Sequence, residues 1–259
     1  MCASPESGLT VDVSILGGLR RGRPHQGTGK GDIVPEIKGV LLPAYVLADE
    51  SGSMSPFRND LYNGLVSLCE GLRAEPMIAA KLRLAILGFS DDVQVRLAIA
   101  DMRVQTALPQ VIIRGLTNYQ AVFDDLLGRI PEDVRWLRGE GYKVHRPVVF
   151  ILSDGQPTDG GAWRGPHSLL TDKSRTPVAP NIIACGIGDA EPATMVEVAT
   201  RPEFAFIARP GVDIGQAISE FFHALTASLV ASSIALNSGT PQLIINRPDQ
   251  FTMAIDEVG

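Results

Sequence analysis

The chain has 259 residues, of which 45% are hydrophobic and 20% are charged, and its net charge at pH 7 is -6. This composition is typical of a globular protein with one large core and excludes a disordered chain. The mild negative charge gives no overall attraction to nucleic acid or to an anionic membrane, so we expect neither as a partner. The three cysteines are far apart and form no CxxC motif, which indicates free thiols.

The N-terminal residues differ in composition from the rest. Residues 1–38 include a basic, Gly-rich run at 17–31 without hydrophobic periodicity, and we expect a flexible arm there. Within it, Gly27-Thr-Gly-Lys-Gly31 lacks the G-x-x-x-x-G-K-[ST] spacing and the following helix of a phosphate loop, so we reject that interpretation. The sequence shows no signal-peptide core and no uncharged apolar run of ~18 residues, which predicts a cytoplasmic protein.

The first predicted strand ends in oxygen-bearing side chains. The run Tyr45-Val-Leu-Ala48 is apolar without alternation, as in a strand buried on both faces of a parallel sheet. Asp49, Ser51 and Ser53 follow at its carboxyl end, where ligands of such sheets bind. One carboxylate and two hydroxyls are hard donors that favour Mg²⁺ or Mn²⁺ over zinc. An isolated D-x-S-x-S motif is equally well explained as a cap on the next helix.

Helix and strand patterns alternate through the middle of the chain. A leucine stripe over 61–72 predicts a helix, and 82–89 and 93–99 predict two strands joined by a short turn. That turn makes the second strand an antiparallel edge strand on an otherwise parallel sheet. Residues 118–130 form a helical pattern, and we expect 132–143, with its charges and Trp136, to be a surface excursion.

Two further stretches place oxygen donors at loop or strand ends. Thr117 directly precedes the 118–130 helix, and a second buried strand, 148–152, ends in Ser153-Asp154-Gly155. Three such ends in one α/β pattern are hard to explain as three independent helix caps.

The remaining residues continue the same alternation. Their patterns predict, in chain order, a loop, a buried strand, a helix, a last strand and a long helix, over residues 160–180, 181–188, 191–200, 204–208 and 213–236. Residues 237–259 form a C-terminal extension with short strand-like pieces, which we expect to form a small hairpin or to pack across the domain.

In these motifs the sequence resembles the von Willebrand factor A domain family with its metal-ion-dependent adhesion site. The resemblance consists of Asp49-x-Ser51-x-Ser53, then Thr117, then Asp154, and covers about residues 41–230. It implies a Rossmann-like three-layer α/β/α sandwich with a mostly parallel sheet over residues 39–236. The phrase at 153–159 is similar to the bacterial intracellular TerY/YegL-like branch, which is associated with tellurite resistance.

The resemblance also implies a site and a function. Asp49, Ser51, Ser53, Thr117 and Asp154 would hold Mg²⁺, or Mn²⁺ or Ca²⁺, and leave a coordination position for an Asp or Glu of a partner protein. The partner would be a kinase or a phosphatase in a stress-response or tellurite-resistance signalling system, or, alternatively, an AAA+ ATPase. We do not count Glu50 as a ligand, and Asp159 is equally well a loop cap. Leu116 stands where the branch usually has a second glycine, which would restrict rearrangement of the threonine loop.

An enzyme is the competing interpretation. A Mg²⁺-dependent phosphatase of the haloacid dehalogenase type needs a second Asp two residues after the first, where this chain has Ser51. The Gly-x-Ser-x-Gly motif of a serine hydrolase is also absent from the sequence. We therefore predict a binding module without catalytic residues, and keep the phosphatase-type hydrolase as the less favoured alternative.

Overall fold

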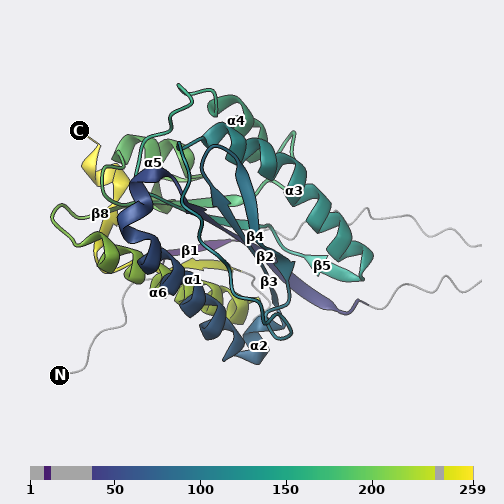
Figure 1. Ribbon diagram of the computed structural model, residues 1–259. Coiled ribbons are helices and arrows are strands. Elements are labelled where there is room, and N and C mark those ends of the chain that lie inside the picture. Colours follow the sequence, from purple (N-terminus) through teal and green to yellow (C-terminus); the bar gives the residue numbers. More distant parts are fainter. Residues whose placement is uncertain (1–8, 13–36, 237–241, 259) are drawn as a thin grey trace, which may run out of the picture.

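A computed structural model describes residues 9–12, 37–236 and 242–258 (Figure 1). Its centre is a mostly parallel sheet in the strand order β10-β8-β7-β6-β2-β3-β4, with β5 also paired to β2. The strands of this sheet are β2 (Gly39–Asp49), β3 (Leu82–Phe89), β4 (Val93–Ala100), β5 (Tyr142–Val144), β6 (Val148–Ser153), β7 (Asn181–Gly186), β8 (Ala205–Ala208) and β10 (Phe251–Met253). Every residue of β3, β6 and β7 is buried, because helices cover both faces of the sheet.

Helices on the two faces complete the three layers (Figure 1). On one face α1 packs against α6, and on the other α3 packs against α4, while α5 lies on β7 and β8. The helices are α1 (Arg58–Arg73), α2 (Pro76–Ala79), α3 (Tyr119–Gly139), α4 (Arg164–Thr171), α5 (Pro192–Val198) and α6 (Ile214–Ala235). Short 3₁₀ turns are η1 (Gly52–Phe57), η2 (Pro202–Phe204) and η3 (Ala254–Glu257). The predicted three-layer α/β/α sandwich is confirmed.

The sheet has an antiparallel strand at each edge. β4 pairs antiparallel with β3, which confirms the edge strand expected from the short turn between them. At the opposite edge β10, from the C-terminal extension, pairs antiparallel with β8. The sequence did not predict this second edge strand, because a three-residue strand has too little periodicity to indicate which strand it will pair with.

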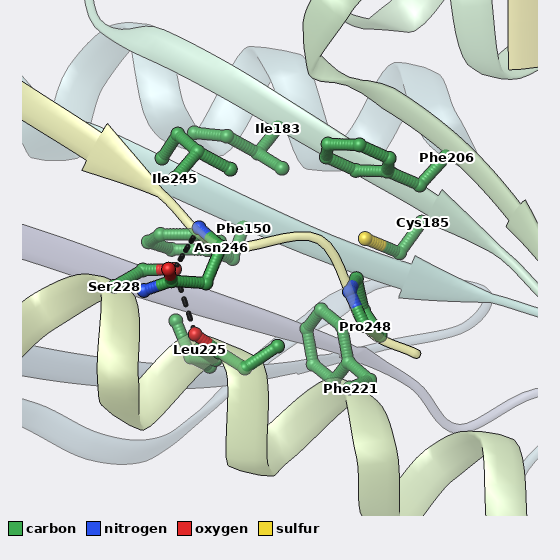
Figure 2. Close-up of a pocket in the computed structure, with 11 residues that line it drawn as sticks. Phe150, Ile183, Cys185, Phe206, Phe221, Leu225, Ser228, Ile245, Asn246 and Pro248 are labelled. Atoms are coloured by element: carbon green, nitrogen blue, oxygen red, sulfur yellow. Dashed lines mark hydrogen bonds between the residues drawn. The ribbon is translucent and has the colours of Figure 1, made fainter. Parts of the chain in front are cut away.

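The C-terminal extension also contributes β9 (Gln242–Ile245), which pairs antiparallel with β1 (Leu9–Asp12). Those four residues of the predicted flexible arm are therefore a strand, and the basic run at 17–31 lies outside the described residues. The C-terminal extension is also hydrogen-bonded to α6 (Figure 2). Ser228 Oγ accepts a hydrogen bond from Asn246 N at 2.9 Å, and Ser232 Oγ accepts one from Ile244 N at the same distance.

A cavity of only about 10 Å³ remains between α6, the sheet and this extension (Figure 2). It is lined mostly by apolar side chains, among them Phe150, Cys185 and Phe221. This volume is at the lower limit for a single water molecule, so the space is a packing defect rather than a ligand site.

By length and composition α6 is the one helix of the described ranges that could cross a membrane, and 56% of its most apolar window is buried in the protein. It packs against α1 and β9. Its apolar character therefore follows from its position in the core.

Two sequence-based expectations about the α3 and α4 layer are wrong. Residues 132–139 are not a surface excursion but the continuation of α3, because Val134 and Leu137 extend its buried stripe beyond Ile130 while the charged residues face outward. Trp136 on this part of the helix is 52% exposed. The predicted loop at 160–180 contains α4, and Trp163 at its start is buried among aromatic rings.

Candidate metal centre

Asp49, the first carboxylate of the predicted site, is buried where the neighbouring strands β2 and β6 end. The two strands are parallel neighbours, with Ala48 opposite Leu152, so Asp49 and Ser153 meet where the strands end. Ser153 Oγ donates a hydrogen bond to Asp49 Oδ2 at 2.6 Å, and Ser51 N donates one to Oδ1 at 2.8 Å. Burial raises the pKa of Asp49 to about 6 despite these two donors, which lower it.

Asp154, the second carboxylate, is connected to the same group of residues by hydrogen bonds through Ser53 and Ser51. Ser51 Oγ and Ser53 Oγ lie 3.0 Å apart, and Ser53 Oγ donates to Asp154 Oδ1 at 2.8 Å. Burial also raises the pKa of Asp154. Asp49 and Ser51 are fully buried whereas Ser53 is exposed, so the cluster is open to solvent on the Ser53 side. The structure thus brings together four of the five residues named from the sequence.

Thr117 lies beside these four. A Cβ placed on Gly155 would be 3.8 Å from Thr117 Oγ1, so the hydroxyl lies next to the residue that follows Asp154. The backbone of the threonine loop is joined to the D-x-S-x-S segment, since Gly52 N donates to Gly115 O at 2.9 Å. It is joined to the loop after Asp154 as well, since Thr158 N donates to Thr117 O at 2.8 Å. Segments far apart in sequence therefore converge on one point.

The turn between β3 and β4 is hydrogen-bonded to the threonine loop, the loop that carries Thr117. Asp91 Oδ1 accepts a hydrogen bond from Leu116 N at 3.1 Å, and Ser90 Oγ donates to Leu116 O at 2.7 Å. Asn118 caps α3 by accepting from Ala121 N at 3.0 Å. The Leu116 side chain is exposed, and no described residue other than glycine has a positive φ, so this position does not need a glycine in the conformation seen here.

A buried ion pair that the sequence analysis did not identify involves Glu50, the residue between Asp49 and Ser51. Glu50 is fully buried, and Arg96 binds its carboxylate with two hydrogen bonds, at 2.9 Å from Nε and at 2.5 Å from the second guanidinium nitrogen. Arg114, on the threonine loop, lies 3.6 Å from the same carboxylate. A Cβ on Gly88 of β3 would overlap Glu50 Cδ, so a larger residue there would displace the Glu50 carboxylate. The available signal was a glutamate in a segment with buried neighbours, which requires a cationic partner.

Asp159 has a local structural role. It accepts hydrogen bonds from Gln120 N at 2.7 Å and from Gly161 N at 3.1 Å, and so holds the first turn of α3 and its own loop. The alternative interpretation of this residue as a loop cap agrees with these contacts.

The donor set fits a hard divalent cation. Asp49 and Asp154 offer two carboxylates, and Ser51, Ser53 and Thr117 offer three hydroxyls. All of these donors are oxygen atoms, which are the ligands that Mg²⁺ prefers. No group of three or more His, Cys, Asp or Glu side chains that could hold a metal occurs within the described ranges, so those ranges contain no competing transition-metal site of that kind. The described cysteines, Cys69 and Cys185, are buried free thiols.

A groove of about 390 Å³ opens next to the cluster, at the carboxyl ends of β7 and β8. A Cβ on Gly188, which lines this groove, would be 3.5 Å from Asp154 Cβ. The walls are mainly apolar, and Asp189, Arg209 and Glu257 add charge. The groove and the cluster therefore share one edge of the sheet.

No family model and no curated protein matches the sequence. Solved structures do match it. The pilus adhesin SpaC from Lactobacillus rhamnosus GG aligns with 73% of this chain and 30% of its own, at 12% identity and a TM-score of 0.57. A von Willebrand factor type A structure from Catenulispora acidiphila aligns with 73% of this chain and 43% of its own, at 16% identity and a TM-score of 0.49.

Proximal thread matrix protein 1 from the mussel byssus, with a zinc-occupied MIDAS motif, aligns with 82% of this chain and 48% of its own, at 15% identity and a TM-score of 0.49. The chain thus spans less than half the length of each of these three proteins. At 12% identity the match to SpaC shows a shared fold. The chain therefore shares its three-layer α/β fold with the matched part of SpaC.

Proposed function

We propose that this chain is a protein-recognition module that depends on a divalent cation held by Asp49, Ser51, Ser53, Thr117 and Asp154. The observation that carries the proposal is the hydrogen-bonded cluster of two carboxylates and two serines, with Thr117 beside it, at an edge of the sheet open to solvent. Two carboxylates buried this closely without a cation are costly, and burial raises the pKa of both. A bound cation would offset that cost.

Each residue has a defined task in this proposal. Asp49 and Asp154 supply the negative charge, and the three hydroxyls supply neutral oxygens. When bound, the cation, for which Mg²⁺ is the first choice and Mn²⁺ or Ca²⁺ the alternatives, supplies a Lewis acid that accepts a carboxylate of a partner. The mainly apolar groove beside Asp154 gives room for the partner's residues next to that carboxylate.

The proposed setting follows from the likeness of residues 153–159 to the TerY/YegL-like branch. It is a cytoplasmic bacterial system for stress response or tellurite resistance, with a kinase or phosphatase as partner. An AAA+ ATPase is the alternative partner. The function proposed is not enzymatic, because Ser51 occupies the position where a phosphatase of the haloacid dehalogenase type needs its second Asp. Hydrolysis of a phosphate ester by the purified chain in Mg²⁺ would contradict this.

Calorimetric titration with Mg²⁺ tests the site. Asp49→Asn and Asp154→Asn should each weaken binding by at least tenfold, because each removes one of the two charges. Asp159→Asn is the matched control, since this carboxylate lies in the loop after Asp154 and binds only backbone amides in the structure. Circular dichroism shows whether each variant is folded. A wild-type chain that binds neither Mg²⁺, Mn²⁺ nor Ca²⁺ would refute the site.

A pull-down from a bacterial lysate tests recognition. The partner should remain bound in Mg²⁺, elute with EDTA, and be absent when Asp49→Asn is the bait. A partner that stays bound to both baits in EDTA would show that docking does not use the cation.

A further inference from the structure

The residues on both sides of Thr117 are bound by the turn between β3 and β4. Leu116 N donates to Asp91 Oδ1 at 3.1 Å, and Leu116 O accepts from Ser90 Oγ at 2.7 Å. On the other side, Asn118 N donates to Ser90 O at 2.9 Å, and Asn118 Nδ2 donates to Asp91 O at 3.1 Å. Ser90 and Asp91 thus make four hydrogen bonds that flank Thr117, and we call this arrangement the clamp.

The clamp begins at the level of the first carboxylate of the site. β3 runs parallel to β2 with Phe89 as the register partner of Asp49, so the turn after β3 starts where the D-x-S-x-S segment starts. Glu50 N donates to Phe89 O at 2.8 Å, which joins the two strand ends. Every residue of β3 is buried, and Ser90 is buried as well. The clamp therefore connects the threonine loop to the end of a buried strand.

The Asp91 carboxylate packs closely against the threonine loop. A Cβ on Gly115 would lie 2.5 Å from Asp91 Oδ2, so a side chain at this position would displace the carboxylate. Gly115 O also accepts a hydrogen bond from Gly52 N at 2.9 Å. The same glycine thus contacts the β3–β4 turn on one side and the D-x-S-x-S segment on the other.

We propose that Asp91 is a positioning residue of the candidate metal centre, whose carboxylate, through Leu116 N, holds Thr117 where its hydroxyl can bind the cation. This rests on the proposed function. Thr117 lies between β4 and α3 in a segment without helix or strand, so contacts with other segments set its position. Groups that orient the ligands of a metal typically change its affinity 10- to 100-fold.

The test is calorimetric titration of Asp91→Ala with Mg²⁺. Because Asp91 is exposed, the variant should fold, which circular dichroism checks. We expect a dissociation constant about tenfold higher than that of the wild type. Asp91→Asn should stay within about threefold of the wild type, because its amide oxygen still accepts from Leu116 N and the lost charge is exposed and screened by salt. Equal losses in the two variants would assign the effect to charge and overturn the proposal.

Asp172→Ala is the matched control. Asp172 follows α4, and its Oδ1 accepts a hydrogen bond from Ser174 N at 2.8 Å. This variant also loses a carboxylate bound to a backbone amide in a turn, and it should bind Mg²⁺ like the wild type. A loss as large as that of Asp91→Ala would mean that any such change weakens the site, which also overturns the proposal.

A double variant tests the route through Thr117. Thr117→Val removes the hydroxyl and keeps the shape of the side chain. If Asp91 acts only through Thr117, Asp91→Ala/Thr117→Val binds Mg²⁺ as weakly as Thr117→Val alone. If the two losses multiply, Asp91 acts by another route and the proposal is wrong.

Amide hydrogen exchange of Leu116 in EDTA gives a readout that needs no cation. This amide should exchange faster in Asp91→Ala than in the wild type, and Asp91→Asn should restore its protection. Equal exchange in Asp91→Ala and the wild type would show that the carboxylate does not hold the loop. A wild-type chain without cation binding refutes the proposed function and this role with it, whereas normal wild-type binding with equal binding by Asp91→Ala refutes only the role of Asp91.

Discussion

Replacing Glu50 by Gln should destabilise the chain strongly, although the substitution preserves the size of the side chain. Glu50 is fully buried, and the Arg96 side chain that binds it is 8% exposed. Ile112 N and Arg114 also contact the carboxylate, at 3.3 and 3.6 Å. The Gln variant leaves the Arg96 guanidinium buried without a counter-charge, which costs about 3–5 kcal/mol in comparable cases.

Urea unfolding in EDTA measures this loss. Trp163 is buried and reports tertiary unfolding by fluorescence, and circular dichroism reports the helices in the same samples. The matched control is Glu197→Gln, since Glu197 pairs with Arg164 on the surface, where both side chains are about half exposed. That exposed pair should contribute less than about 1 kcal/mol.

Two results would refute the reasoning on Glu50. One is a loss for Glu50→Gln no larger than the loss for Glu197→Gln. The other concerns Glu50→Gln/Arg96→Met, which removes both charges and should recover much of the lost stability, because it is the unpaired cation that is costly. If the double variant is no more stable than Glu50→Gln, the penalty comes from something other than the buried charge.

Further variants test packing, protonation and the C-terminal extension. In α1, Gly64→Ala should lower the free energy of unfolding by about 1–3 kcal/mol, because its Cβ would overlap the Phe222 ring of α6. Gly128→Ala, in open space on α3, should raise it by about 0.5–1 kcal/mol, so equal effects would contradict the packing. Burial lowers the pKa of His167 below its usual 6.5, so the unfolded chain binds the proton more readily and stability should fall as pH drops through 6.5. Urea unfolding from pH 7.5 to 5 should show a smaller fall for His167→Gln, and an unchanged fall would assign it to other groups. Ser228→Ala should cost about 1–3 kcal/mol in the same assay, because it leaves a backbone amide of the C-terminal extension unsatisfied, and no loss would show that this contact does not stabilise the extension.

Local patterns in the sequence determined the layers of this protein. The leucines of α1 recur at helical spacing, and the apolar runs of β2 and β6 lack alternation, so each segment specifies its own conformation and the faces that it buries. The strand ends at Asp49 and Asp154 indicated two carboxylates at the carboxyl edge of the sheet, and the resemblance to the von Willebrand factor A family implied that Thr117 belongs to the same site.

The tertiary structure alone decided the contacts between those segments. Glu50 is a structural ion-pair residue because β4 and the threonine loop bring Arg96 and Arg114 to it, and neither arginine is near it in sequence. Periodicity reports which face of a segment is buried, whereas the partner of a buried polar group depends on strand order and on loops that have no periodicity.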